Sequence, residues 1–251
     1  MHYKINITYD GLAYKGWQKL PDNPKTIQET IENALTTMTG ETIHISGSGR
    51  TDAGVSAVGQ VADFFCDTAL DTSSLESINS LLPSDITITD ICEVPADFHA
   101  RKSAISKTYA YCIALDDKPD VFSAKHLYTP HHGKLDIASM KKCVDYLTGT
   151  HDFSAFTTDK RKDKSHIRTV TDINLSIIKC ISGKEVLVIK VSGNGFLYNM
   201  VRIIAGTLVF AGVGKLNPDD IPAIIASKKR INAGPTLPSN ALFLCKVEYN
   251  L

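Results

Sequence analysis

Apolar and polar residues alternate along residues 3–9, which predicts a half-buried strand at the start of the chain. Apolar residues then recur at helical spacing over 27–38, after a capping box formed by Thr26 and Glu29. Further runs predict strands over 42–46, 60–65 and 86–94 and a short helix over 75–82. The first hundred residues therefore follow the order β-α-β-β-α-β, which is typical of ferredoxin-like folds.

The second half has a similar mixture of elements. Its patterns predict strands over 107–115, 175–179, 185–192 and 242–249 and helices over 136–147, 196–212 and 218–227. We therefore predict an α+β fold with two ferredoxin-like halves, residues 1–104 and 105–251, that join mostly antiparallel sheets around a central cleft. The likeness of the halves points to an old duplication, although no sequence repeat is legible.

A glycine-rich loop, Gly47–Gly59, lies between two of the predicted strands. Four glycines in its thirteen residues allow close backbone approach, and the loop also carries Arg50 and Asp52. A carboxylate there is compatible with a nucleophile, a general base, a metal ligand or a turn residue. A metal site is disfavoured because no second acid or histidine lies within a few residues, and no Gly-Lys-Ser/Thr follows to make a phosphate loop.

The helix predicted over 196–212 contains a charge in apolar surroundings. Asn199, Arg202 and Gly206 fall on one face of this otherwise apolar segment. An arginine there needs a partner, because an unpaired buried charge is very costly. The pattern alone leaves open whether that partner is a structural ion pair or part of a site.

Composition limits the function classes. The 251 residues are 43% hydrophobic and 22% charged, with a formal net charge of zero, so nucleic-acid binding would need a local basic patch. Residues 160–168 hold five basic residues, which fits either a solvated loop or an arm that grips RNA. The apolar run 196–212 is too short to span a bilayer, and the chain starts directly with a strand rather than a signal peptide.

Cysteine and histidine usage adds two expectations. Six cysteines without a Cys-x-x-Cys pair mostly fall in apolar patterns and predict buried free thiols in a reducing cytoplasm. The His131-His132 pair beside Pro130 is interpreted as a turn, not a metal site. We expect a cytoplasmic protein with no membrane segment, metal or cofactor.

The loop sequence Gly49-Arg50-Thr51-Asp52-Ala53-Gly54-Val55 resembles the signature of the TruA-type tRNA pseudouridine synthases. Similar motifs follow in family order along nearly the whole chain. They are Tyr-Asp-Gly…Gly-Trp-Gln near the start, Phe98–Ala104, Lys107-Thr108-Tyr109 and Phe196–Arg202. One departure is Ser56, where the family often has histidine.

The resemblance implies a role for each matched residue. Asp52 would be the nucleophile and Arg50 would help to extrude the target base. Tyr109 would stack on the flipped uracil, Arg202 would pair with the catalytic carboxylate, and Leu242 would wall the uracil pocket. The implied or expected tRNA contacts are Phe98, Arg101, Lys102, Lys164 and Arg168.

The implied function is isomerisation of uridines in the tRNA anticodon stem-loop (positions 38–40) to pseudouridine, by a homodimer whose subunits share one tRNA. The reaction involves no redox change, so it needs no cofactor. Two alternatives remain: a non-catalytic RNA-binding or chaperone-like module, and a pseudouridine synthase for another RNA. A hydrolase or a dinucleotide-binding enzyme fits poorly, because the chain lacks the nucleophile elbow and the glycine fingerprint.

Overall fold

The structure, a computed structural model, describes residues 1–21, 25–130, 134–161 and 163–250. Backbone contacts divide the chain into two compact units. Unit 1 consists of Met1–Lys107 and Phe243–Leu251, and unit 2 of Thr108–Leu242. The last strand therefore packs with the first hundred residues. The predicted division into halves 1–104 and 105–251 stays a prediction.

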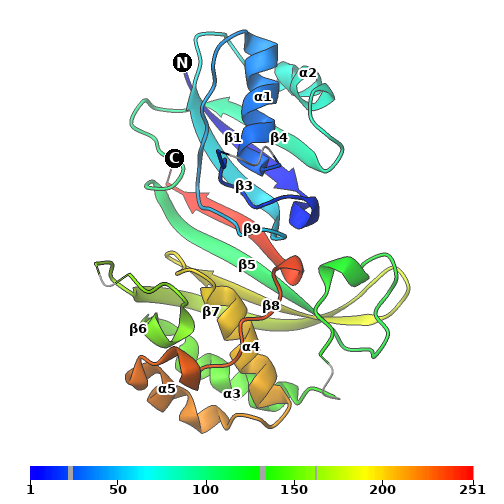
Figure 1. Ribbon diagram of the computed structural model, residues 1–251, viewed down its shortest axis with the longest axis vertical. Coiled ribbons are helices and arrows are strands. Elements are labelled where there is room, and N and C mark those ends of the chain that lie inside the picture. The colour runs from blue at the N-terminus through cyan, green and yellow to red at the C-terminus, as the bar shows by residue number, and fades with distance from the viewer. Residues whose placement is uncertain (22–24, 131–133, 162, 251) are drawn as a thin grey trace. The chain divides into compact units, whose positions relative to one another are not determined.

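Unit 1 is a sheet with two helices on one face (Figure 1). Its strands follow the order β4-β1-β3-β9, with the short β2 added to β3. Strand β1 is antiparallel to both β3 and β4, whereas β3 and β9 pair in parallel through Ser56 and Phe243. The bounds are β1 (His2–Tyr9), α1 (Ile27–Thr39), β2 (Ser46–Gly47), β3 (Ser56–Phe65), α2 (Leu75–Ser80), β4 (Ile86–Glu93) and β9 (Leu242–Tyr249).

Unit 2 is also a sheet covered by helices on one face (Figure 1). Its strand order is β5-β8-β7-β6, and β7 pairs antiparallel with both β6 and β8. The bounds are β5 (Ala104–Ala114), α3 (Ile137–Leu147), β6 (Gly149–Asp152), β7 (Ile167–Lys179), β8 (Glu185–Gly193), α4 (Met200–Gly212) and α5 (Ile221–Ser227). Strand β5 begins in unit 1 and continues into unit 2.

Short 3₁₀ helices complete the two units. They are η1 (Gly11–Ala13), η2 (Thr72–Ser74), η3 (Ala124–His126), η4 (Phe153–Phe156), η5 (Pro218–Asp220), η6 (Arg230–Asn232) and η7 (Ser239–Ala241). The predicted α+β class with mostly antiparallel strands is confirmed.

The elements that differ from their sequence prediction include β2, β7 and α4. Strand β2 has only two residues, because just Ser46 and Gly47 pair with β3. Strand β7 starts at Ile167, eight residues before the predicted start, since its first part pairs with β6 although it is too polar to give an apolar pattern. Helix α4 starts at Met200 rather than 196, because Asn199 takes a left-handed conformation with φ 63° that helix geometry excludes.

The remaining structural expectations have mixed outcomes. All six cysteines are free, but only Cys66 and Cys143 are buried, and the other four are partly exposed. No helix among the described residues is long and apolar enough to cross a bilayer. The His131-His132 pair lies outside the described residues.

Candidate active site

The glycine-rich loop leaves β2 at a point held by buried side chains. The Ser48 amide donates to the Val61 carbonyl at 2.7 Å, and the Ser48 hydroxyl donates to Gln60 Oε1 at 2.7 Å. Gln60 also donates from Nε2 to the Gly49 carbonyl at 3.1 Å. Both Ser48 and Gln60 are fully buried, so these polar groups satisfy one another away from water.

The middle of the loop is fixed at Thr51. Its hydroxyl shares a 2.7 Å hydrogen bond with the Tyr9 hydroxyl, and its carbonyl accepts from the Trp17 amide at 3.0 Å. Burial raises the pKa of Tyr9 to about 12, so its hydroxyl keeps its proton at neutral pH. The Trp17 ring lies where a Cβ on Gly47 would approach it at 2.6 Å, which explains why glycine is required there. Trp17 is thus a buried anchor of the core.

Arg50 and Asp52 flank this fixed point. Arg50 is exposed and Asp52 is partly exposed. A turn follows, in which the Val55 amide donates to the Asp52 carbonyl at 3.1 Å and Gly54 takes φ 80°. The loop therefore presents one cation and one anion from a backbone that neighbouring residues hold in place, and the nucleophile role of Asp52 stays a prediction.

Ser56 has a structural task in this protein. Its hydroxyl accepts the Gly11 amide at 3.0 Å, and its side chain is buried. A Cβ on Gly11 would lie 1.9 Å from the Val55 carbonyl oxygen, so this close approach needs both the glycine and the small serine. The small side chain at position 56 thus closes the end of the loop against η1.

The segment after β4 separates into buried and exposed residues. Phe98 is buried and packs on Tyr249, with ring centroids 5.1 Å apart, so its side chain supports the segment from within the core. The Ala100 amide donates to Asp63 Oδ1 at 2.7 Å. Arg101 and Lys102 are exposed at the end of this anchored segment. The Phe98 side chain is thus part of the core, and an RNA contact of this residue stays a prediction.

In unit 2, polar groups that hold the Arg202 guanidinium include the Leu237 carbonyl and the Asn199 side chain. Its Nε donates to the Leu237 carbonyl at 2.6 Å, and Nη1 donates to Asn199 Oδ1 at 2.8 Å. The same side chain of Asn199 donates to Thr158 Oγ1 at 2.7 Å. Asn199, whose left-handed conformation sets the first residue of α4, therefore also orients the Arg202 side chain.

Two other predicted site residues lie in unit 2. Tyr109 packs edge-on against Phe196, with ring centroids 5.4 Å apart. Leu242, at the start of β9, is buried. The edge-on contact fixes the plane of the Tyr109 ring, which suits a ring that stacks on a base.

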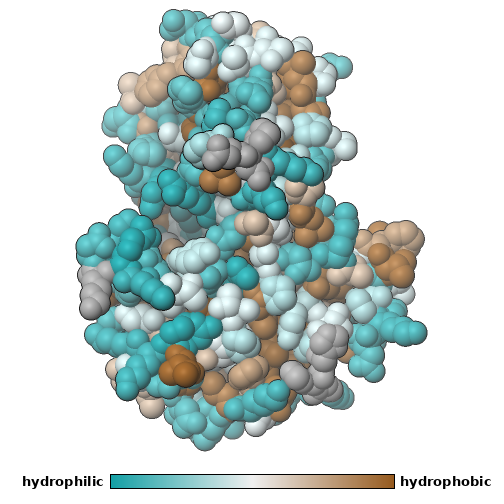
Figure 2. Space-filling view, in the orientation of Figure 1, coloured by the Kyte–Doolittle hydropathy of each residue, from teal (hydrophilic) through white to brown (hydrophobic). Residues whose placement is uncertain are grey.

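The basic segment before β7 is less uniform than its sequence indicates. Arg161 donates from Nε to both carboxylate oxygens of Asp159, at 2.8 and 2.9 Å, and this holds the pKa of that carboxyl below its usual range. Arg168 donates to the backbone carbonyls of Ser165 and Ile167. Lys164 is exposed. In Figure 2 the segment forms a hydrophilic area at the left edge of unit 2.

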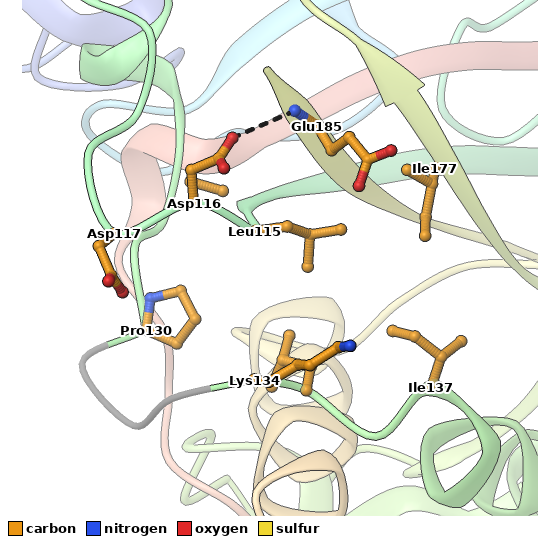
Figure 3. A pocket seen from close by; sticks show the side chains of 10 residues that line it. Leu115, Asp116, Asp117, Pro130, Lys134, Ile137, Ile177 and Glu185 are labelled. Atoms are coloured by element: carbon orange, nitrogen blue, oxygen red, sulfur yellow. Dashed lines mark hydrogen bonds between the residues drawn. The ribbon is translucent and has the colours of Figure 1, made fainter.

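A pocket of about 500 Å³ lies elsewhere in unit 2 (Figure 3). Apolar side chains such as Leu115, Ile137 and Ile177 face its interior, and Asp116 accepts the Glu185 amide at its rim. None of the predicted site residues is among those that line it. Among the residues that the structure describes, no three His, Cys, Asp or Glu side chains are grouped as metal ligands would be.

Comparison with known proteins fits the motifs. The family model described as tRNA pseudouridine synthase matches residues 5–101 and 143–250. The chain belongs to the tRNA pseudouridine synthase family. Enzymes of this family isomerise uridine to pseudouridine, and tRNA is their substrate.

Relatives of the synthase family resemble the chain along its whole length. It is 43% identical to tRNA pseudouridine synthase A of Acetivibrio thermocellus over 247 residues, which cover 98% of each protein. It is 44% identical to the same-named protein of Caldicellulosiruptor bescii, again over 98% of each. It is 41% identical to tRNA pseudouridine synthase A 2 of Bacillus cereus strain ZK over 99% of each.

One chain in the crystal structure of a Cbf5-Nop10-Gar1 complex aligns with 82% of this chain. The alignment covers 45% of that chain, at 12% sequence identity. Its TM-score of 0.36 is too low to support an argument. The synthase family is thus identified by sequence and by the ordered motifs.

Sequence reasoning missed the supports behind these motifs. Gln60 and Lys107 hold the loop, but their only signal in the sequence is that Gln60 follows the glycine-rich loop and that Lys107 begins the Lys107-Thr108-Tyr109 motif. A strand or loop pattern does not reveal which polar side chain turns inward.

Proposed function

We propose that this protein converts uridines of the tRNA anticodon stem-loop to pseudouridine, with Asp52 as the nucleophile. The C1′–N1 glycosidic bond breaks, the uracil rotates, a C1′–C5 bond forms, and the proton on C5 leaves while N1 gains one. The atoms of substrate and product are the same, and no electrons are transferred. The proposal rests above all on the family match over residues 5–101 and 143–250, together with the position of Asp52 in a glycine-rich loop that buried side chains hold in place.

The other residues take roles that follow from the resemblance. The target base leaves its stack, which costs a few kcal/mol. Arg50, exposed on the loop, fills the vacated space, and the ring of Tyr109 stacks on the extruded uracil. The Arg202 cation keeps the Asp52 carboxylate ionised and aligned. Leu242 contributes an apolar wall.

The test measures tritium release from tRNA that carries [5-³H]uridine. Wild-type protein should release tritium, and Asp52→Asn, which keeps the shape but loses the charge, should lower the rate by more than about a thousandfold, or ~4 kcal/mol. Asp52→Asn should keep its affinity for tRNA and its melting temperature. Turnover by this variant would remove Asp52 as the nucleophile, and a silent wild type would favour the binding-module alternative.

The choice of RNA needs a separate experiment. Pseudouridines are mapped across all RNAs in cells with and without the gene. Loss of pseudouridine from anticodon stem-loops supports the proposal, whereas loss from another RNA assigns the enzyme to that substrate. We also propose a homodimer, because two neutral subunits can combine basic patches on one tRNA. Sedimentation equilibrium checks this.

A further inference from the structure

Lys107, on β5, reaches the backbone of the catalytic loop. Its Nζ donates to the Ser48 carbonyl at 2.5 Å. A Cβ on Gly49 would lie 3.1 Å from the same nitrogen, so the glycine leaves room for the lysine to approach. Ser48 is fully buried and Lys107 is partly exposed, so this contact is partly shielded from bulk water.

The lysine completes a set of restraints on the loop. Gln60 holds the Gly49 carbonyl, Tyr9 holds the Thr51 hydroxyl, and Lys107 holds the Ser48 carbonyl. Carbonyls of a non-repetitive loop need partners when they are buried. The residues on either side of Arg50 are therefore fixed by side chains from β1, β3 and β5.

The surroundings of Lys107 disfavour its charge. Burial, with a smaller contribution from the nearby Arg101 cation, lowers the pKa of Lys107 to about 8. From β9, the Tyr249 hydroxyl lies near Ser48, and burial raises the pKa of that phenol. Glu248 of the same strand accepts the Ser106 hydroxyl at 2.5 Å. The ammonium is thus kept in a crowded site where its proton is released near physiological pH.

We propose that Lys107 is a positioning residue of the reaction: its ammonium clamps the Ser48 carbonyl and thereby holds Asp52 in the geometry for attack. The inference rests on the proposed role of Asp52. A charged donor makes a hydrogen bond about twice as strong as a neutral one. Deprotonation therefore loosens the clamp without removing the side chain, and the rate of the chemical step falls.

The test is the pH dependence of single-turnover tritium release at saturating tRNA. Wild type should lose rate as the pH rises through about 8, where Lys107 gives up its proton. Lys107→Arg keeps a charged donor and should move this decline to higher pH. Lys107→Met should lower the rate about tenfold at pH 7 and abolish the decline. Lys141→Met, at an exposed lysine of α3, serves as the matched control and should behave like wild type.

Each contrary result has a distinct meaning. Titration of the tRNA itself affects all variants equally, so only differences between profiles count. Profiles of Lys107→Arg and Lys107→Met that coincide with wild type would overturn the inference. A raised tRNA dissociation constant with an unchanged rate at saturation would make Lys107 a phosphate contact instead, and would also overturn it. Activity of Asp52→Asn would refute the nucleophile role of Asp52, and a silent wild type would refute the proposed function, each independently of the lysine variants.

Discussion

At the scale of the residue, Arg202 combines two kinds of interaction. Its Nε and Nη1 bind the Leu237 carbonyl and Asn199, which sets the direction of the guanidinium. Its charge, by the proposed mechanism, stabilises the Asp52 carboxylate. A purely structural arginine would have the first property only, so the two roles can be separated by a measurement that reports on charge.

We predict that Arg202→Met lowers turnover more than about a hundredfold at pH 7 and shifts the acidic limb of the pH–rate profile to higher pH. A nearby cation lowers the pKa of a carboxyl, so its removal raises that pKa, and ionised Asp52 then requires a higher pH. The variant should also lose about 1–3 kcal/mol of stability, because the Leu237 carbonyl and Asn199 lose a partner. The profile is read from initial rates at saturating tRNA, and stability from urea unfolding.

The control for this prediction is Arg230→Met. Arg230 donates to the Gly234 carbonyl at 2.8 Å and to Thr236 Oγ1 at 3.0 Å, in the same segment that holds Arg202. The Arg230→Met variant should destabilise this segment without moving the acidic limb of the pH–rate profile. An acidic limb that stays in place in Arg202→Met would show that the arginine does not act on the carboxylate.

At the scale of the element, α4 depends on a close approach to the chain that follows α5. A Cβ on Gly206 would lie 2.0 Å from the Pro235 carbonyl oxygen, and one on Gly234 would lie 2.5 Å from Thr207. The Thr207 hydroxyl also accepts the Gly234 amide at 2.9 Å. Helix and segment are therefore in backbone contact, and this contact supports the Leu237 carbonyl that binds Arg202.

We predict that Gly206→Ala destabilises the protein by at least about 3 kcal/mol, because the added methyl group collides with backbone that cannot move independently. Gly212→Ala, in the same helix, is the matched control. The atoms nearest to its methyl group would all belong to side chains: Cγ and Sδ of the flexible Met140 at 3.0 Å and Cδ2 of Leu135 at 3.3 Å. Alanine is also up to about 1 kcal/mol better than glycine in a helix, so this control should be nearly neutral. Urea midpoints compare the two, and equal losses would contradict the close approach.

The same helix illustrates what the sequence can and cannot predict. The run of apolar residues predicts that α4 exists. The charge in these apolar surroundings indicates that Arg202 needs a partner. The predicted first residue of α4 is wrong, because the helix cannot include Asn199 in its left-handed conformation. That conformation depends on contacts with Thr158 and Arg202, not on local preference. Likewise the first part of β7 is a strand because β6 pairs with it, which an apolar pattern does not record.

The candidate site was predictable to the extent that its residues lie in motifs. Arg50 and Asp52 stand out because a glycine-rich loop carries them. Lys107 lies in a motif but is given no role, and Gln60 lies in none, because their importance comes from the direction of their side chains towards Ser48 and Gly49. Phe98 is expected to contact RNA because it lies in a family motif. Its apolar ring is buried next to Val61 and Val94, a placement that the hydrophobic effect favours.

At the scale of the whole molecule, the net charge is zero, with 27 basic and 27 acidic residues. Affinity for a polyanion must then come from particular exposed cations rather than from a general field. Arg101, Lys102 and Lys164 are exposed, whereas Arg161 is already paired with Asp159. We therefore expect tRNA binding to depend on particular exposed cations, and test it at Arg101 and Lys164.

We predict that Arg101→Gln and Lys164→Gln each raise the dissociation constant for tRNA and each reduce the slope of log affinity against log salt by about 0.7–0.9, the value for one released counterion. Phosphate contacts carry no sequence information, so the loss should be equal for a tRNA whose target uridines are replaced by cytidines. Lys141→Gln, which removes the same charge from α3, controls for the change in net charge and should leave the slope unaltered. The slopes come from filter-binding titrations between 50 and 300 mM KCl, chosen as roughly the range in which counterion release dominates. Unchanged slopes in both variants would mean that these cations are only solvated, and that other parts of the surface hold the RNA.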